Sequence, residues 1–193
     1  MSQSFDASRS LTALEQDNTI IAVIEISKTK WLVAALVPGL KRQPLKKLDA
    51  DAPALLKLLQ RWRDEAGRAG HPVKRIAVAY GAAGDGFWLA RFLLARGIEA
   101  YAIHAASIAV SREHRRAKTD RLDTKQLMRA FLGWLRSEKR HCSMAAILTL
   151  EEEDERRPNR ERESLVGEQT RLVNRIKAVL TRFGIRSFRL SLR

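Results

Sequence analysis

The sequence predicts an α/β domain built on a mixed β-sheet, followed by a long C-terminal helix. Three observations predict this class. Short segments rich in β-branched and apolar residues come first and are separated only by tight turns, which is typical of an antiparallel start. Two further apolar segments then alternate with segments whose apolar residues recur at helical spacing. Finally, the last part of the chain carries a long one-sided apolar stripe.

The first three strands are short and are separated by the polar turn 28–30 and by Pro38-Gly39. We expect them at residues 19–26, 31–37 and 43–48. The polar residues 1–18 contain no such pattern and are expected to form a flexible tail.

A helix is expected over 51–69, because Leu55, Leu59 and Trp62 recur at helical spacing and Asp51 can cap its start. The following segments predict a strand at 74–80, a glycine-containing loop at 81–86, a helix at 87–96 closed by Gly97, and a strand at 98–104. The resulting order, β-β-β-α-β-α-β, is the one found in ribonuclease-H-like folds. The expected fold class is therefore an α/β, ribonuclease-H-like mixed sheet with flanking helices.

The second half changes character. Residues 151–163, EEEDERRPNRERE, mix both charges and are expected to form a solvated linker. A long helix is expected over 164–184, with its apolar residues on one face. This face would either pack on a second copy as a short coiled coil or dock on the core of its own chain. The expected organisation is a tail at 1–18, a domain at 19–150, and the linker and helix at 151–193.

The charge balance favours a nucleic-acid partner. Lys and Arg number 36 against 22 Asp and Glu, which gives a net charge of +14 and a sequence pI near 10.7. Simple solubility or a ribosome-like packing role are the alternatives. The single cysteine excludes an internal disulfide, and no apolar stretch is long enough to cross a membrane, so a cytoplasmic protein is expected.

The segment 112–123, REHRRAKTDRLD, combines two carboxylates with five basic residues. Asp120 and Asp123 would share one face of a helix and could hold one divalent cation. The neighbouring cations could hold a phosphodiester beside it; they are Arg112, Arg115, Arg116, Lys118 and Arg121. The alternative is that both acids merely favour the first turn of a helix. Glu25, inside an apolar strand, is the candidate for a third metal ligand, or else faces outward at an edge.

Three segments together resemble a known family: IAVIEISKTKW, GAAGDGFWLARFLLARGIEAYAI and SREHRRAKTDRLDTKQL. Over about residues 19–190 the chain resembles the insertion-sequence transposases of the one-ten family, the DEDD group with a RuvC-like N-terminal domain. The resemblance implies four acids that bind Mg²⁺ or Mn²⁺. The last two fall at Asp120 and Asp123, and the first falls at Glu25, where the family has Asp. The second falls at Gly81, where the family has Glu, and nearby Asp85 is a candidate substitute.

The resemblance implies DNA transposition, with DNA as a partner and a structured guide RNA as a second candidate partner. It also implies a C-terminal domain with a nucleophilic serine, which we expect to lie beyond Arg193. Because Gly81 offers no ligand, cleavage by this chain is expected to be impaired or absent. Homo-oligomers are expected to form through the 164–184 helix. The alternatives are a RuvC-like Holliday-junction resolvase, a nucleic-acid-binding remnant without catalysis, or an interaction protein.

Overall fold

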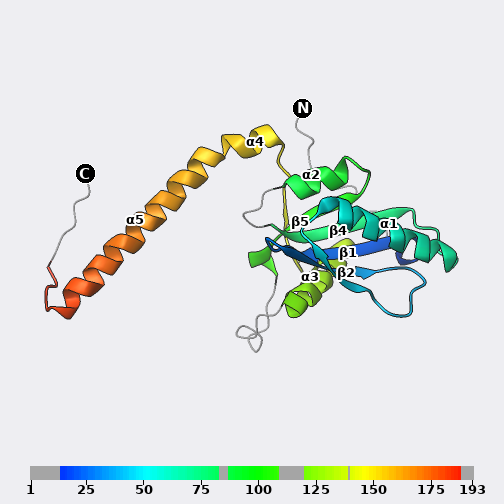
Figure 1. Cartoon of the computed structure of the whole chain (residues 1–193), viewed down its shortest axis with the longest axis horizontal. Coiled ribbons are helices and arrows are strands. Elements are labelled where there is room, and N and C mark those ends of the chain that lie inside the picture. The colour runs from blue at the N-terminus through cyan, green and yellow to red at the C-terminus, as the bar shows by residue number, and fades with distance from the viewer. Residues whose placement is uncertain (1–13, 83–86, 109–119, 139, 188–193) are drawn as a thin grey trace. The chain divides into compact units, whose positions relative to one another are not determined.

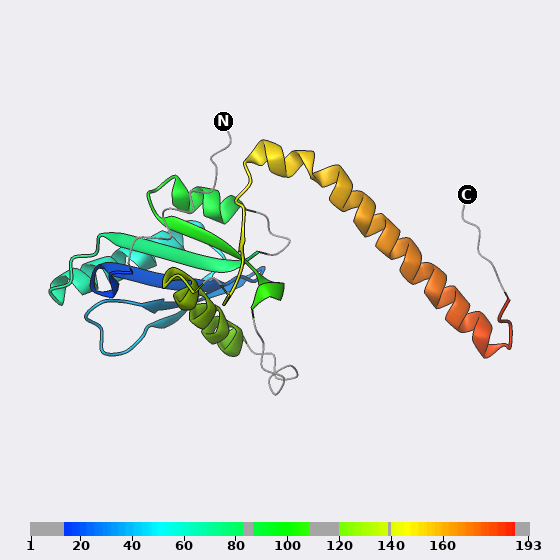
Figure 2. The same cartoon turned by 180° about the vertical axis from the view of Figure 1, so that it is seen from behind.

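The computed structural model describes residues 14–82, 87–108, 120–138 and 140–187 (Figures 1 and 2). The chain forms two compact units, Met1–Thr149 and Leu150–Arg193. The first unit contains a sheet with helices on both faces, and the second unit is helical.

The sheet of the first unit has six strands in the order β3-β2-β1-β4-β5-β6. Their bounds are β1 Thr19–Glu25, β2 Lys30–Leu36, β3 Leu45–Asp49, β4 Arg75–Ala82, β5 Glu99–His104 and β6 Met144–Ala145. The pairs β1·β2, β2·β3 and β5·β6 are antiparallel, whereas β4 runs parallel to both β1 and β5. This arrangement confirms the predicted ribonuclease-H-like mixed sheet. The short strand β6 was not among the strands predicted from the sequence.

Helices cover both faces of the sheet, as Figure 1 shows. The helices α1 (Ala52–Arg68) and α2 (Trp88–Leu94) lie over one face, and α3 (Asp120–Leu135) lies over the other. Alternate residues of β1 therefore enter two different cores: Ile20, Ala22 and Ile24 pack with α1 and α2, and Ile21 and Val23 pack with α3. All five are fully buried, so β1 is the most enclosed strand of the sheet.

The helix boundaries follow local chemistry. The Asp51 carboxylate accepts a hydrogen bond from the Ala54 N–H at 2.9 Å, as expected for a helix cap, and Pro53 lies in the first turn of α1. After α2, Gly97 adopts φ +72°, a left-handed conformation that costs glycine little. The start of α1 and the end of α2 were both predicted from these residues.

An ion pair joins the first residues of β4 and β5. The Arg75 Nε and Nη2 atoms each lie 2.8 Å from a carboxylate oxygen of Glu99, and the Tyr101 hydroxyl donates to Glu99 at 2.6 Å. The hydrogen bond to Glu99 raises the pKa of Arg75. Burial, reinforced by the bond to Glu99, raises the pKa of Tyr101. This network fixes the start of two parallel strands.

The second unit contains α4 (Leu150–Glu155) and α5 (Arg157–Arg182). The charged stretch 151–163, expected to be a linker, is thus largely helical, and the long helix begins at Arg157 instead of Ser164. Pro158 is compatible with this start because the first backbone N–H groups of a helix have no intrahelical partner. No residue of α5 is buried in this chain. Among the described residues, no helix is long and apolar enough to span a membrane.

Candidate active site

Two of the predicted site positions lie near the carboxyl ends of two adjacent parallel strands in the middle of the sheet. The parallel strands β1 and β4 are in register up to the pair Ile24 and Tyr80. Glu25 and Gly81 are the next residues of their strands. The two positions at which the family resemblance places the first two acids are therefore neighbours in adjacent strands.

These two positions also belong to one face of the sheet. Side chains alternate between faces along a strand, so Glu25 shares the face of Val23, and Gly81 shares the face of Ala79. Val23 and Ala79 are buried in the core that α3 covers. Glu25 is only partly buried, as expected for a residue that ends its strand at the rim of this core.

The third described position, Asp123, belongs to the helix on that face. Asp123 lies in the first turn of α3, one turn before Leu127, which is 3% exposed and packs in the same core as Val23 and Ala79. Spacing of four residues places Asp123 and Leu127 on the same side of the helix. Asp123 is partly buried, and the next residue, Thr124, is only 1% exposed.

The other predicted residues are only partly described. Asp120 is the first residue of α3 and Arg121 is the second, but their side chains lie outside the described residues. The predicted phosphate-binding residues Arg112, Arg115, Arg116 and Lys118 lie outside the described residues altogether, and so does Asp85. The basic half of the predicted site therefore stays a prediction.

Gly81 has room for a side chain. A Cβ atom built there meets no heavy atom within 4 Å, and Gly81 is a strand residue. A ligand side chain is thus lacking because of residue type and not because the backbone is crowded. Among the described residues, no group of three or more His, Cys, Asp or Glu could hold a metal ion. Glu25 and Asp123 are the two carboxylates of the predicted site whose side chains the structure describes.

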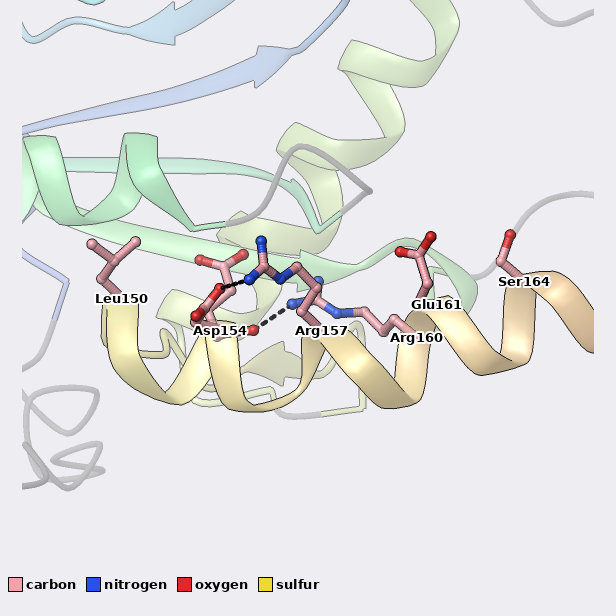
Figure 3. A pocket seen from close by; sticks show the side chains of 7 residues that line it. Leu150, Asp154, Arg157, Arg160, Glu161 and Ser164 are labelled. Atoms are coloured by element: carbon pink, nitrogen blue, oxygen red, sulfur yellow. Dashed lines mark hydrogen bonds and ion pairs between the residues drawn. The ribbon is translucent and has the colours of Figure 1, made fainter.

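A separate hollow of about 360 Å³ lies at the junction of α4 and α5 (Figure 3). Its arginines are already engaged: Arg157 pairs with Asp154 at 3.2 Å, and Arg160 Nη2 donates to the Glu153 carbonyl at 2.8 Å. These interactions join the two helices, and we assign the hollow a structural role.

Comparison with known proteins identifies the family. Residues 22–185 match the family model of DEDD transposases of the IS110 type, which carries the description "Transposase". The chain belongs to this transposase family. The match confirms the resemblance drawn from the sequence and includes Glu25, Gly81, Asp123 and the whole of α5.

A curated relative agrees with this family. The chain is 40% identical over 182 residues to the protein named "Putative transposase y4rJ" of Sinorhizobium fredii (strain NBRC 101917 / NGR234). The alignment covers 92% of this chain and 46% of the relative, so the chain spans about half the length of the relative that it matches. No solved structure matches the chain significantly.

Sequence reasoning did not single out Thr124, the buried polar residue beside Asp123. One signal was available, since Thr124 lies one turn before Met128 and two before Phe131 and Leu132 in a helix with an apolar face. The basic residues of α1 were also passed over, because a charged helix face is ordinarily a solvated one.

Proposed function

We propose that this chain is the nucleic-acid-binding α/β domain of a DNA-transposition protein, and that its nuclease-type site is incomplete. One observation carries the proposal. Glu25, the last residue of β1, and Gly81, the second-to-last residue of the parallel strand β4, share the face covered by α3, whose first turn holds Asp123. This arrangement supports a carboxylate site to which β4 contributes no ligand side chain.

The incompleteness has two parts. Gly81 cannot ligate a metal, and Glu25 carries one methylene more than the Asp that the family resemblance places there. Catalytic geometry tolerates errors of only about 0.5 Å, so a longer side chain misplaces the oxygen atoms. Weak or absent cleavage is the expected consequence, with the nucleic-acid-binding surface retained.

Mg²⁺ or Mn²⁺ is the cofactor that suits the donors present. Glu25, Asp120 and Asp123 would hold it, because carboxylate oxygens are the ligands that these hard cations prefer. A bound divalent ion would stabilise the charge that develops when a phosphodiester is cleaved. The basic run from Arg112 to Arg121 would position the phosphate backbone, and a cytoplasmic location would give it access to DNA.

Calorimetric titration with Mn²⁺ tests the metal part of the proposal. The native chain is compared with the double variant Asp120→Ala, Asp123→Ala. Binding by the native chain alone supports the carboxylate site. Equal heats from both proteins would show that these residues are not the ligands.

Binding of DNA at increasing salt tests the nucleic-acid part. The double variant Arg115→Ala, Arg116→Ala should bind all sequences more weakly, and its salt dependence should be shallower by about 0.9 for each phosphate that the variant no longer neutralises. A flat salt profile for the native chain would contradict the proposal and favour an interaction protein. The same assay with RNA tests whether a structured guide RNA is a partner.

We further propose that α5 forms homo-oligomers. The exposed apolar residues along it recur at alternating steps of three and four, as in a coiled-coil seam, and Gln169 occupies one position of that seam. These residues are Leu165 at 59% exposure, Leu172 at 58%, Ile176 at 37%, Val179 at 48% and, at the C-cap, Phe183 at 77%. A stripe of this kind has the spacing at which a second copy of the same helix can pack.

A further inference from the structure

A groove of about 560 Å³ lies on the face of the sheet that carries α1 and α2. Its floor is apolar and includes Leu59 of α1, Ile76 near the start of β4, and Ile98, which immediately precedes β5. The groove therefore lies at the ends of β4 and β5 that are opposite to the candidate active site. The two places also lie on opposite faces of the sheet.

The rim of the groove is basic. Four cations contribute to its lining: Lys57, Arg61 and Arg63 of α1, and Arg96, which follows α2. Asp64 is the single carboxylate among the lining residues. All five side chains belong to exposed residues. Arg61 is paired with Glu65 at 2.8 Å, and the lining still has a surplus of positive charge around an apolar floor.

Two of the arginines are held in place by neighbouring groups. The Arg96 guanidinium lies 3.6 Å from the centre of the Phe92 ring, and its Nη1 donates to the Phe92 carbonyl at 2.9 Å. Arg63 Nη2 reaches the Val73 carbonyl at 3.4 Å. A guanidinium has five N–H donors, so each retains others for a ligand. Such fixed cations lose less conformational entropy on binding than free ones.

We propose that this groove binds the phosphodiester backbone of a nucleic acid, as a second contact surface separate from the candidate active site. The proposal rests on the proposed nucleic-acid-binding function. Gly81 lies five positions after Ile76 along β4, which corresponds to about 16 Å. With the sheet between them as well, the groove holds a different segment from the one beside Glu25. A chain with two such surfaces can hold two nucleic-acid segments at once.

The alternative ligand of the groove is a group of protein carboxylates. Among the described helices, Leu150–Glu155 has the highest share of acidic residues. The charge balance favours nucleic acid. The chain carries 36 Lys and Arg against 22 Asp and Glu, so its own acids cannot neutralise its cations. Phosphate contacts release condensed counterions and so gain affinity that carboxylates of a folded chain do not provide.

Fluorescence anisotropy over a salt series tests the proposal with the whole chain. The probes are a short labelled DNA duplex, its single strand, and an RNA of the same sequence. The groove variant is Lys57→Gln, Arg61→Gln, Arg63→Gln. The control variant, Lys41→Gln, Lys46→Gln, Lys47→Gln, removes the same charge from exposed residues outside the groove.

The groove variant should lose on the order of 100-fold in affinity for at least one probe at about 0.15 M salt, with a salt slope shallower by about 2.7. The control variant should lose less than about fivefold, the effect of one neutralised phosphate. The charge-retaining variant Arg61→Lys, Arg63→Lys should bind nearly as the native chain does, which guards against a loss caused by misfolding.

Three outcomes overturn the proposal. Equal losses in the groove and control variants would mean that only net charge matters. Unchanged binding by the groove variant would exclude the groove while leaving the proposed function intact. Unchanged binding together with altered sedimentation would identify an acidic protein segment as the occupant. No binding of any probe by the native chain would instead defeat the proposed function itself.

Discussion

Replacing Gly81 with Glu tests whether the strand ends of β1 and β4 can be completed as a metal site. The structure leaves space for the change, because a Cβ at this position meets no heavy atom within 4 Å. Gly81→Gln is the matched control, since glutamine has the same shape without the charge. Both variants should gain about 0.5–1 kcal/mol from replacing a glycine within a strand.

Without metal, the two variants should differ in stability. Adjacent strands lie about 4.8 Å apart, so the new carboxylate would lie beside Glu25 on the same face. Two negative charges about 5–6 Å apart repel by about 3 kcal/mol at an effective dielectric constant of 20. Glu25 is partly exposed, and solvent screening should reduce this to roughly 1–2 kcal/mol. Gly81→Glu should therefore melt about 3–6 °C below Gly81→Gln.

Mn²⁺ should reverse this order. A ligand present at 100 times its Kd stabilises the folded state by about 2.7 kcal/mol, which corresponds to a rise in Tm of about 5–10 °C for a domain of this size. The rise should occur with Gly81→Glu and be much smaller with Gly81→Gln. Differential scanning calorimetry with and without Mn²⁺ measures both effects.

Equal responses of the Glu and Gln variants to Mn²⁺ would refute the reasoning. They would show that a carboxylate at position 81 does not reach a common ligand site, and the assignment of the second acid to this position would be wrong. A further check uses Glu25→Gln in the Gly81→Glu background. This change should relieve the repulsion in the absence of metal and should also remove most of the response to Mn²⁺.

Three further perturbations have definite expected outcomes. Leu172→Glu places a charge in the exposed apolar stripe of α5 and should convert oligomers to monomers in analytical ultracentrifugation; an unchanged mass would exclude that seam. Gly133→Ala would bring a Cβ to 2.5 Å from His141 Cδ2 and should cost about 1–3 kcal/mol in urea unfolding. Combining it with His141→Ala should recover most of that loss, and purely additive costs would contradict the predicted clash. Burial raises the pKa of Cys142 from 9.0 to about 11 and also raises the pKa of Tyr101, so the folded state binds these protons more tightly than the unfolded state. The contribution of these groups to the free energy of unfolding should be constant below pH 9 and should fall as the pH rises toward 11, by about 2–3 kcal/mol for the Cys142 thiol. In Cys142→Ala, the part of this pH dependence that the thiol causes should disappear.

The sheet could be predicted from the sequence where local chemistry decides the structure. The β-branched run from Thr19 specified β1, and the Asp51 cap with the apolar spacing behind it specified α1 within one or two residues. The strand β6 was missed because Met144 and Ala145 form a strand only through pairing with β5, and two residues carry no periodic pattern. The early start of α5 was missed because its first turns hold charged residues, which have no apolar period to recognise.

The candidate site was predictable in its residue types but not in its arrangement. A carboxylate in an apolar strand and a carboxylate in a helix turn can be read from the sequence at Glu25 and Asp123. Glu25 and Asp123 come to the same face of the sheet only because side chains alternate along β1 and because α3 packs over that face. Both depend on how the chain folds and cannot be read from local sequence. The basic groove was missed for the same reason: Arg96 joins Lys57 and Arg61 only after α1 and α2 pack on one sheet.

Both edges of the sheet oppose growth by strand addition. The outer strand β3 presents the exposed lysines 46 and 47, and positive charge on an edge strand repels an identical edge. At the other side, β6 offers only two residues, too few to template a neighbour. Copies that meet are therefore steered away from an open-ended, backbone-paired aggregate. Under the proposed function, association would instead use side chains on helices such as α5, where the geometry can limit the number of copies. That would protect a basic chain whose copies gather along a bound nucleic acid.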